Sequence, residues 1–394
     1  MAIVSNASSL AGCYFLNDVP DQEWTDMGEW SGHVRLKIFK DGDNVQTLLE
    51  PATAVDGKVY LRGLAEVLRS YVPHVQLTET VFTNNAYSET GVPEVMFSAC
   101  LIDANDIDPH PGTIRQSFVV YALCRTTHDP VNDVMFLTRY RERTIPPEQY
   151  VMANFFARSG IKLRERLWFV PEQSVTPQQE YITQHVREFS SGVVMQNSPR
   201  FIGMYCCSVR ALAAIEHYQD VSHLWMVDLE LVNSQDEVVD MIRFWLDHQH
   251  HAQLTLVGFT NCFGVPEVEA FTGVAERSEI LNGEYGWIDD QYQKLSEDIT
   301  LERHLNVVIN DKDHRSSLHD MATAPHVYVL REEGLVKYEE VTVTSATNTH
   351  RKPYTSPSVC SVTLRNCDRV FDTLTRMAWD ETYDPDYMGG LYDE

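Results

Sequence analysis

The chain has 394 residues, of which 43% are hydrophobic and 22% are charged, proportions typical of a folded soluble protein. Its 57 acidic against 31 basic residues give a formal net charge of −26, which argues against binding to nucleic-acid phosphates or to anionic membranes. The length exceeds that of one ordinary hydrophobic core, so we expect two or three domains.

Targeting signals and cysteine spacing indicate the cellular compartment in which the protein folds. No stretch approaches the roughly 20 apolar residues of a membrane-spanning helix, and the N-terminal MAIVSNASSLAG lacks a basic region followed by a long apolar core. We therefore expect a protein that is made and folded in the cytoplasm, with no membrane insertion. The cysteines are scattered and lack CxxC spacing, which favours reduced structural thiols. They are Cys13, Cys100, Cys124, Cys206, Cys207, Cys262, Cys360 and Cys367.

The first segment, residues 1–125, is predicted to be a β-sandwich-like domain. After a loop-rich entry, apolar residues alternate from Val34 to Ile38, a turn follows at 41–44, and residues 45–49 return as a second strand. A short strand at 58–61 leads into a helix that ends before Pro73. Further strands are expected at 75–82, 95–101 and 116–124.

The second segment, residues 126–253, is predicted to be an α+β domain. Strands are expected at 163–170, 201–209 and 224–232. Thr176 followed by Pro177 resembles a helix start, which predicts a helix with Ile182, Val186 and Phe189 on its inner side. The capping box from Ser234 to Glu237 predicts a second helix. Its inner residues would be Val238, Ile242, Trp245 and Leu246.

The third segment, residues 254–394, begins with a strand, a sharp corner and a second strand. The corner contains Gly264, Val265, Pro266 and Glu267, in which proline restricts the preceding residue and glycine can adopt a positive φ. The pentapeptide GVPEV also occurs at 91–95, a weak sign of an internal repeat. A helix capped by Asp313, a strand meander from 326 to 364 and a mobile acidic tail from 380 complete the prediction. The whole chain is thus predicted to be mainly β (α+β), multidomain, with β-sandwich or barrel-like modules that each carry one or two short helices.

Clusters of reactive side chains were weighed against simpler roles. The cluster of His248, His250 and His251 lies at a predicted helix end, where such residues are common, and does not define a metal site. Cys206 and Cys207 are expected to be neutral thiols on opposite faces of a strand. The acidic run at 103–108 departs from a calcium loop at Ile107 and is expected to be a surface turn.

Two further groups have functional alternatives. Asp289 and Asp290 could act as acid and base, although a solvated turn is the default. The basic run RYRER at 139–143 is expected to be a solvated strand face. We predict no catalytic residues, no metal ligands and no cofactor. Trp287, Tyr285 and Tyr292 are candidate surface aromatics for stacking on a ligand such as a sugar, with burial in the core as the alternative.

The stretch FTNCFGVPE at 259–267 resembles structural proteins of the tail modules of bacteriophages and prophages of gut anaerobes. Other parts of the chain are similar to the same proteins: the strand pair and helix at 34–71, the strand and acidic turn at 119–138, the late helix and meander at 318–343, and the ending at 369–374. The resemblance implies a non-enzymatic virion component of the tail or baseplate that works by assembly and carries no catalytic residues.

Three functions follow, in order of preference. The first is a structural tail or baseplate protein that forms a homo-oligomer and packs against other tail proteins. The second is a carbohydrate- or cell-surface-binding module that recognises a host glycan. The third is a cell-envelope hydrolase that uses Asp289 and Asp290.

Overall fold

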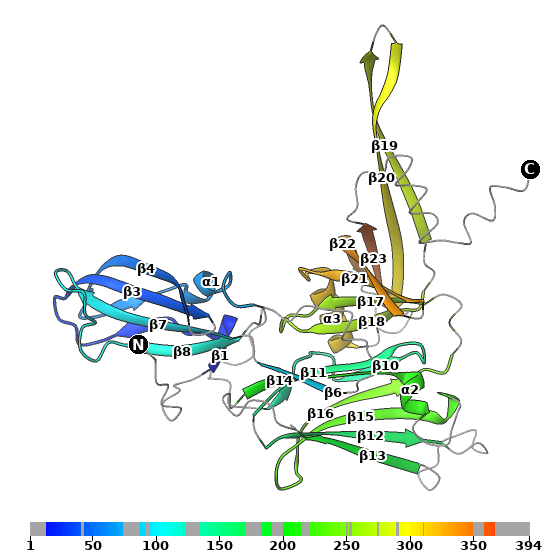
Figure 1. The fold of residues 1–394 in the computed structure, drawn as a ribbon, viewed down its shortest axis with the longest axis horizontal. Coiled ribbons are helices and arrows are strands. Elements are labelled where there is room, and N and C mark those ends of the chain that lie inside the picture. The colour runs from blue at the N-terminus through cyan, green and yellow to red at the C-terminus, as the bar shows by residue number, and fades with distance from the viewer. Residues whose placement is uncertain are drawn as a thin grey trace, which may run out of the picture. The chain divides into compact units, whose positions relative to one another are not determined.

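A computed structural model shows a mainly β chain with several sheets, which confirms the predicted fold class (Figure 1). The chain divides into two compact units: unit 1 contains residues 1–248 and 260–267, and unit 2 contains residues 249–259 and 268–394. None of the helices in the described part is long and apolar enough to cross a membrane. The structure describes residues 13–40, 43–73, 87–91, 94–120, 122, 134–158, 160–170, 183–190, 200–214, 221–249, 251, 254–273, 276–288, 291–309, 311–333, 335–349 and 358–366.

The N-terminal part of unit 1 is a five-stranded sheet with strand order β1-β8-β7-β3-β4. The predicted hairpin is formed by β3 and β4, and its inward residues Val34, Leu36 and Ile38 are buried, which confirms the alternation. The predicted helix is α1, whose Leu64 and Leu68 join the same apolar core. The elements are β1 (Cys13–Phe15), β3 (Ser31–Lys40), β4 (Asp43–Thr53), β7 (Glu94–Asp103), β8 (Arg115–Val120) and α1 (Leu64–Leu68), with the separate pair β2 (Gln22–Trp24) and β5 (Val59–Leu61).

The rest of unit 1 is a sandwich of two sheets that share one apolar core. The five-stranded sheet has the order β10-β16-β15-β12-β13, and the four-stranded sheet has the order β6-β14-β11-β9. The five-stranded sheet consists of β10 (Glu142–Ile145), β12 (Lys162–Phe169), β13 (Thr183–Ser190), β15 (Leu224–Val232) and β16 (Val238–Leu246). The four-stranded sheet consists of β6 (Tyr87–Gly91), β9 (Met135–Phe136), β11 (Tyr150–Arg158) and β14 (Arg200–Ser208), and the short helix α2 (Val209–Ala213) follows β14.

Two predicted helices of this region are wrong. The residues after Ser234 form β16, where Ile242, Phe244 and Leu246 are buried on alternate positions, whereas a helix would bury Ile242, Trp245 and Leu246 together. The capping box is the hairpin turn between β15 and β16, because the Asn233 side chain accepts hydrogen bonds from the backbone N–H groups of Gln235 and Glu237, each at 2.9 Å. Residues 183–190, predicted to continue the helix from Thr176, form β13 instead, and 176–182 lie outside the described residues.

Unit 2 is built on a seven-stranded sheet with the order β18-β17-β21-β22-β23-β20-β19. The predicted meander is confirmed. Helix α3 (Lys312–Ala322) begins at an Asp311 cap, so the predicted Asp313 cap is wrong by two positions. Leu318 and Met321 of α3 lie in the core of this unit, as predicted. The strands are β17 (Thr255–Thr260), β18 (Pro266–Phe271), β19 (Glu276–Ile288), β20 (Gln291–Val308), β21 (Val327–Glu333), β22 (Leu335–Thr349) and β23 (Val359–Asn366).

A long hairpin projects from this sheet, as Figure 1 shows for β19 and β20. β20 pairs with β19 from Gln291 to His304, but with β23 only from Glu302 to Val308. Among the described residues, β20 from 291 to 301 therefore has β19 as its pairing partner on one side and no strand on the other. At about 3.3 Å per residue, this two-stranded part extends roughly 35 Å beyond the sheet.

The division into units differs in layout from the three segments suggested by the sequence. The chain leaves unit 1 after His248, returns to it at Thr260 and leaves it again after Glu267. The two GVPEV stretches also occupy different positions: the first joins β6 to β7, which belong to different sheets, and the second joins neighbours of one sheet. The pentapeptides therefore do not mark the same structural element twice.

Candidate functional site

The corner between β17 and β18 is a tight loop formed by Cys262, Phe263 and Gly264. The backbone N–H of Gly264 donates to the Asn261 carbonyl at 2.9 Å, and that of Asn261 donates to the Val265 carbonyl at 3.0 Å. Gly264 has a φ of 72°, which is the left-handed conformation that completes such three-residue hairpin loops. The sequence expectation of a sharp corner that uses a positive-φ glycine is confirmed.

The side chain of Asn261 organises the corner from inside. Its Oδ1 accepts a hydrogen bond from the backbone N–H of Phe263 at 2.9 Å. Its Nδ2 donates to the Leu137 carbonyl and to Oε2 of Glu267, both at 2.8 Å. A single amide thus joins the loop, the start of β18 and the strand segment near β9.

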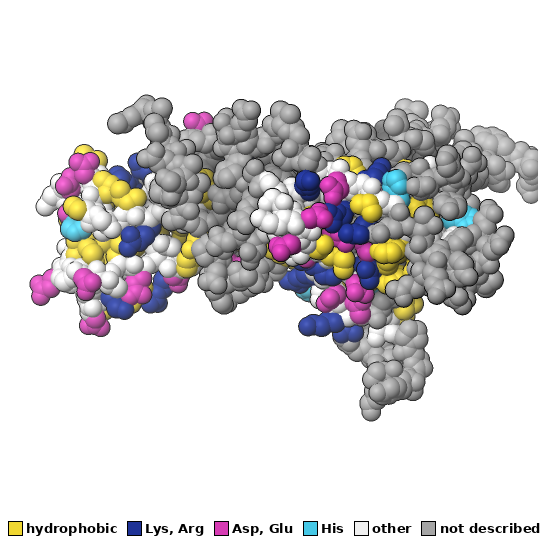
Figure 2. Space-filling model, turned by 90° about the horizontal axis from the view of Figure 1, so that it is seen from below, with side chains coloured by type: hydrophobic (Ala, Val, Ile, Leu, Met, Phe, Trp, Pro, Cys, Tyr) yellow, Lys and Arg dark blue, Asp and Glu magenta, His cyan; other side chains and the backbone are white. Residues whose placement is uncertain are grey.

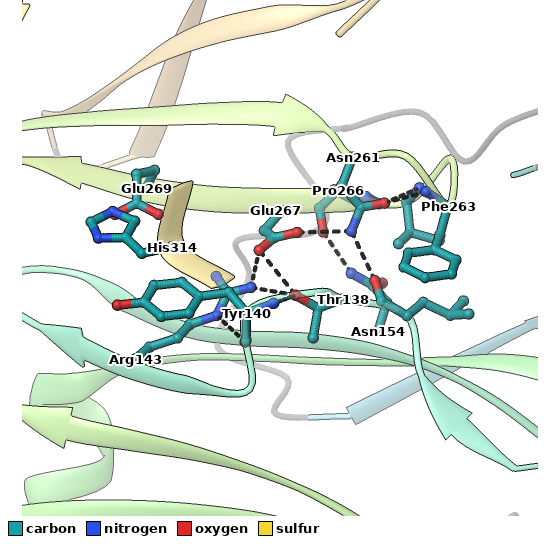
Figure 3. Close-up of polar contacts among 12 residues, drawn as sticks. Thr138, Tyr140, Arg143, Asn154, Asn261, Phe263, Pro266, Glu267, Glu269 and His314 are labelled. Atoms are coloured by element: carbon teal, nitrogen blue, oxygen red, sulfur yellow. Dashed lines mark hydrogen bonds and ion pairs between the residues drawn. The ribbon is translucent and has the colours of Figure 1, made fainter. Parts of the chain in front are cut away.

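Glu267 forms the charged centre of this network, which Figure 3 shows. Its Oε1 accepts from Nη2 of Arg143 and, at 3.2 Å, from the Thr138 hydroxyl. Arg143 also donates to the Thr138 hydroxyl at 2.7 Å and to the Tyr140 carbonyl at 3.1 Å. The side chains of Arg143 and Glu267 are only 4% and 5% exposed. Burial keeps water from competing, so the pair fixes geometry strongly, provided both partners are present.

Apolar contacts and a further amide hold the other side of the corner. Cys262, Phe263 and Val265 belong to a buried cluster that also contains Phe15 and Phe156. The rings of Phe15 and Phe263 meet edge to face with centroids 5.9 Å apart. Asn154 of β11 donates to the Pro266 carbonyl at 2.6 Å. The corner is therefore a packed structural clamp within unit 1, in which Gly264, Val265, Pro266 and Glu267 come together as predicted.

Sequence reasoning missed the basic half of this clamp. The RYRER stretch was expected to be a solvated face, but Arg143 is 3% exposed and faces Glu267. Arg141 is half-buried and bonds Asp240 at 2.7 Å. The correction has a simple cause: β10 lies at the edge of its sheet, and alternate residues point into the core. The sequence does show a basic residue, Arg143, on a predicted strand and an acidic residue, Glu267, at the predicted corner. It contains no pattern that indicates that these two residues are partners.

A second buried carboxylate was also missed. Glu165 of β12 has no exposed surface and receives two 2.7 Å hydrogen bonds from Arg187 of β13. The Tyr205 hydroxyl of β14 donates to its Oε2. Burial, followed by the nearby Glu165 charge, raises the pKa of Tyr205 well above its ordinary value. Strand β12 reads KLRERLWF, and its alternation places Glu165 among leucines on the core face.

Unit 2 contains its own buried polar contact between β18 and α3. Nε2 of His314 lies 3.2 Å from Oε1 of Glu269, and both side chains are less than a tenth exposed. Asp320 and Ser317 of the same helix are also buried. The polar side of α3 therefore faces the protein interior in part, which the amphipathic pattern of Leu318 and Met321 did not indicate.

The predicted aromatic residues lie in the projecting hairpin. Trp287 and Tyr292 are cross-strand partners in the register of β19 and β20, and Tyr285 is paired with Lys294. By the alternation of a strand, the backbone positions of Tyr285 and Trp287 share one side of the hairpin with Tyr292.

The other candidate groups are less concentrated. His248 and His251 are described, His250 lies outside the described residues, and in the described chain no group of three or more His, Cys, Asp or Glu could hold a metal. Asp289 and Asp290 also lie outside the described residues. The acidic run is a surface turn, as predicted: Asp106 accepts from the N–H groups of Ile107 and Asp108. Hydrogen bonds from His110 and then Trp30 lower the pKa of Asp103.

The vicinal cysteines are both buried on β14, as predicted for structural thiols. Cys207 lies in the core between the two sheets, and its neighbour Cys206 points to the opposite face by strand alternation. Burial raises the pKa of Cys207 to about 11 and raises that of Cys206 further. Such thiols are poor nucleophiles at neutral pH.

Comparison with known proteins adds no family: no family model matches the chain, and no curated protein matches its sequence.

Proposed function

We propose that this protein is a non-enzymatic structural component of a phage or prophage tail or baseplate, which works by self-assembly and by packing against other tail proteins in the virion. The observation that carries the assembly part is the hairpin of β19 and β20. The phage context comes from the resemblance at 259–267 and the other similar stretches.

A two-stranded ribbon in water holds together weakly, and a strand edge with free N–H and C=O groups is a template for pairing with another chain. Among the described strands, β20 presents such an edge from 291 to 301, and the stretch 276–308 contains no proline that would block pairing. A hairpin of this kind suits a partner that adds a strand or encloses the ribbon.

The buried clamp supports the same function. Its charged and amide groups are used to hold a corner between strands, which is a mechanical role. A particle component that transmits load between neighbours benefits from fixed corners of this type.

The decisive experiment shortens the hairpin without disturbing the sheet. Ser278 and Glu302 are cross-strand partners, so residues 279–301 can be replaced by Asn-Gly, a favoured two-residue hairpin turn. Light scattering after size-exclusion chromatography, then negative-stain imaging, should show closed oligomers or complexes with neighbouring tail proteins for the full chain, and their loss in the shortened chain. A full chain that stays monomeric and binds no neighbouring tail protein would refute the proposal.

A second function, recognition of a host surface glycan, is favoured by one observation. The register places the positions of Trp287, Tyr285 and Tyr292 on one side of the hairpin near its turn. Aromatic rings combine apolar faces with polar edges, which suits sugar rings. A glycan array with hits that disappear in Trp287→Ala would support this function, and an array without hits would remove it.

A further inference from the structure

The outward side of the five-stranded sheet in unit 1 carries an unusual combination of side chains. We define the tryptophan face as the residues of β12, β13, β15, β16 and β10 that alternate with the core positions. In register, one row across three strands is Trp168, Met226 and Trp245. The ring of Trp225 meets that of Trp245 edge to face, with centroids 5.2 Å apart.

A second row beside the first is charged. Arg166, Asp228 and Arg243 are direct cross-strand neighbours, and Glu142 of β10 follows Arg243. Arg243 bonds Asp228 at 2.7 Å, and Nε of Arg166 forms an ion pair with Oε1 of Glu230 at 2.9 Å. Trp168 donates to Asp228 at 3.0 Å, and the Arg243 guanidinium lies 5.4 Å from the centre of the Trp245 ring. The charges and the rings therefore form one connected layer.

The layer continues toward the other end of the strands. Arg164 is bonded to Glu188 at 2.8 Å and also to Asp236, and Lys162 lies 3.4 Å from Glu188. The face thus holds four basic side chains, Lys162, Arg164, Arg166 and Arg243, against four acidic ones, Asp228, Glu230, Glu188 and Glu142, and Asp236 of the turn between β15 and β16 adds a fifth acidic group at its margin. On a chain with a net charge of −26 this face is nearly neutral. Figure 2 shows basic, acidic and apolar side chains interspersed on one side of the molecule.

We propose that the tryptophan face is the surface through which two copies of this chain associate, sheet against sheet. This inference rests on the proposed function, because it names one surface of the self-assembly. Two acidic chains repel each other, so close contact requires a patch where the charges already compensate. Each arginine of the face is already paired with a carboxylate, so burial of the face leaves none of these arginines as an isolated charge.

The composition of the tryptophan face also fits an interface. Protein interfaces are enriched in tryptophan, methionine and arginine at their centres. The face has three tryptophans, Met226 and Met241; its apolar side chains Val186 and Met241 are 44% and 37% exposed, whereas Met226 is only 5% exposed. None of the four clusters of buried apolar residues in the described chain includes a residue of this face.

The area of the tryptophan face also fits a contact between two copies. Four strands of eight or nine residues and the four-residue β10, at about 3.3 Å per residue and about 4.8 Å between strands, give a face of roughly 600 Å². Two such faces bury about 1,200 Å² together, which is the lower limit for stable specific interfaces. Face-to-face packing of two sheets at an angle set by their twist is a common arrangement in sandwiches.

The test uses exposed positions so that folding is retained. Val186→Glu, on the edge strand β13, and Met241→Glu, on β16, each place a carboxylate on the tryptophan face, whereas Leu49→Glu, at a position 57% exposed on β4, is the matched control. Sedimentation velocity over a concentration series should show a reversible dimer for the parent chain and for Leu49→Glu. The dimer should weaken tenfold or more in each of the other two variants.

The outcomes separate this inference from the proposed function. Assembly that is equally strong in all variants overturns the tryptophan face as the contact but leaves assembly through the hairpin intact. A parent chain that is monomeric throughout overturns the inference, and the proposed function then depends on binding to neighbouring tail proteins. If the parent chain is monomeric and binds a glycan, and Trp168→Ala abolishes that binding, the tryptophan face is a sugar-binding surface and the inference is also overturned.

Discussion

Arg143 and Glu267 are 124 positions apart in the sequence, yet they form a buried ion pair in which both side chains are almost inaccessible to water. The pair ties β10 and its preceding turn to the corner that starts β18. Among the hydrogen bonds of the clamp described above, this is the only one that joins two fully charged side chains.

We expect Arg143→Ala to lower the free energy of unfolding of unit 1 by about 3–5 kcal/mol, because Glu267 is left as an uncompensated buried charge. Urea unfolding followed by tryptophan fluorescence measures this change. Arg365→Ala is the control, since Arg365 is 46% exposed and its pair with Glu302 should contribute at most about 1 kcal/mol. Replacing both partners by methionine should recover most of the loss; if it does not, the pair matters through its hydrogen bonds to Thr138 and Tyr140.

Gly264→Ala should destabilise the corner by about 1–2 kcal/mol, because a Cβ atom is unfavourable at a φ of 72°. Gly264→Asn should cost less, since asparagine adopts this conformation more readily than alanine. Thermal unfolding of the two variants side by side measures the difference. Equal losses of stability in the two variants would mean that steric contacts of the added side chain, and not the backbone conformation, account for the need for glycine at position 264.

Tyr205→Phe should reduce stability by about 1.5–3 kcal/mol, because the hydroxyl donates to the fully buried carboxylate of Glu165. Tyr60→Phe is the control: Tyr60 is 39% exposed, and its loss should lie within about 0.5 kcal/mol. Denaturant midpoints of the two variants give the comparison. A Tyr205→Phe chain as stable as the parent would show that Arg187 alone satisfies Glu165.

Stability should also depend on Glu188 in acid. The hydrogen bond from Arg164 lowers the pKa of Glu188 below its ordinary value of 4.5. A carboxylate whose pKa is lower in the folded state than in the unfolded state stabilises the fold at pH values above the unfolded-state pKa. This contribution is lost as the pH falls below about 4.5 and then through the folded-state pKa of Glu188. The stability difference between the parent and Glu188→Gln should therefore shrink as the pH falls from about 6 to about 3. A difference that grows in acid would contradict the assignment.

The described buried cysteines should resist modification in the folded chain. Burial raises the pKa of Cys207 and of Cys360 to about 11, so the reactive thiolate is scarce near pH ~8. Alkylation followed by peptide mass mapping should find Cys100, Cys206, Cys207, Cys262 and Cys360 unmodified until denaturant is added. Rapid labelling of Cys207 under native conditions would indicate that the sandwich opens.

The comparison of sequence and structure shows where local patterns suffice. The hairpin of β3 and β4 and the corner at Gly264 follow from alternation and from the conformational limits of glycine and proline, which act within a few residues. Strand β16 shows the limit. Val238, Ile242, Trp245 and Leu246 fit a helical stripe, but the same segment also alternates, and pairing with β15 on one side and β10 on the other decides in favour of the strand.

Only the corner half of the clamp could be predicted from the sequence. Gly264 and Pro266 mark the corner locally, whereas the partners Arg143, Thr138 and Asn154 are brought to it by sheet pairing over more than 100 positions. A single sequence holds no record of such pairings. The charged row on the tryptophan face was hidden for the same reason, because each strand alone resembles an ordinary solvated strand.

The return of residues 260–267 to unit 1 has a consequence for biosynthesis. When a ribosome has translated the chain to His248, every strand of the sandwich in unit 1 has been made, but Phe156, Ile202 and Phe15 still lack Cys262, Phe263 and Val265 as packing partners. Arg143 likewise lacks Glu267. Unit 1 therefore reaches its final form only after translation has passed Glu267, and a nascent chain arrested at the apparent end of that unit would display an apolar surface to chaperones.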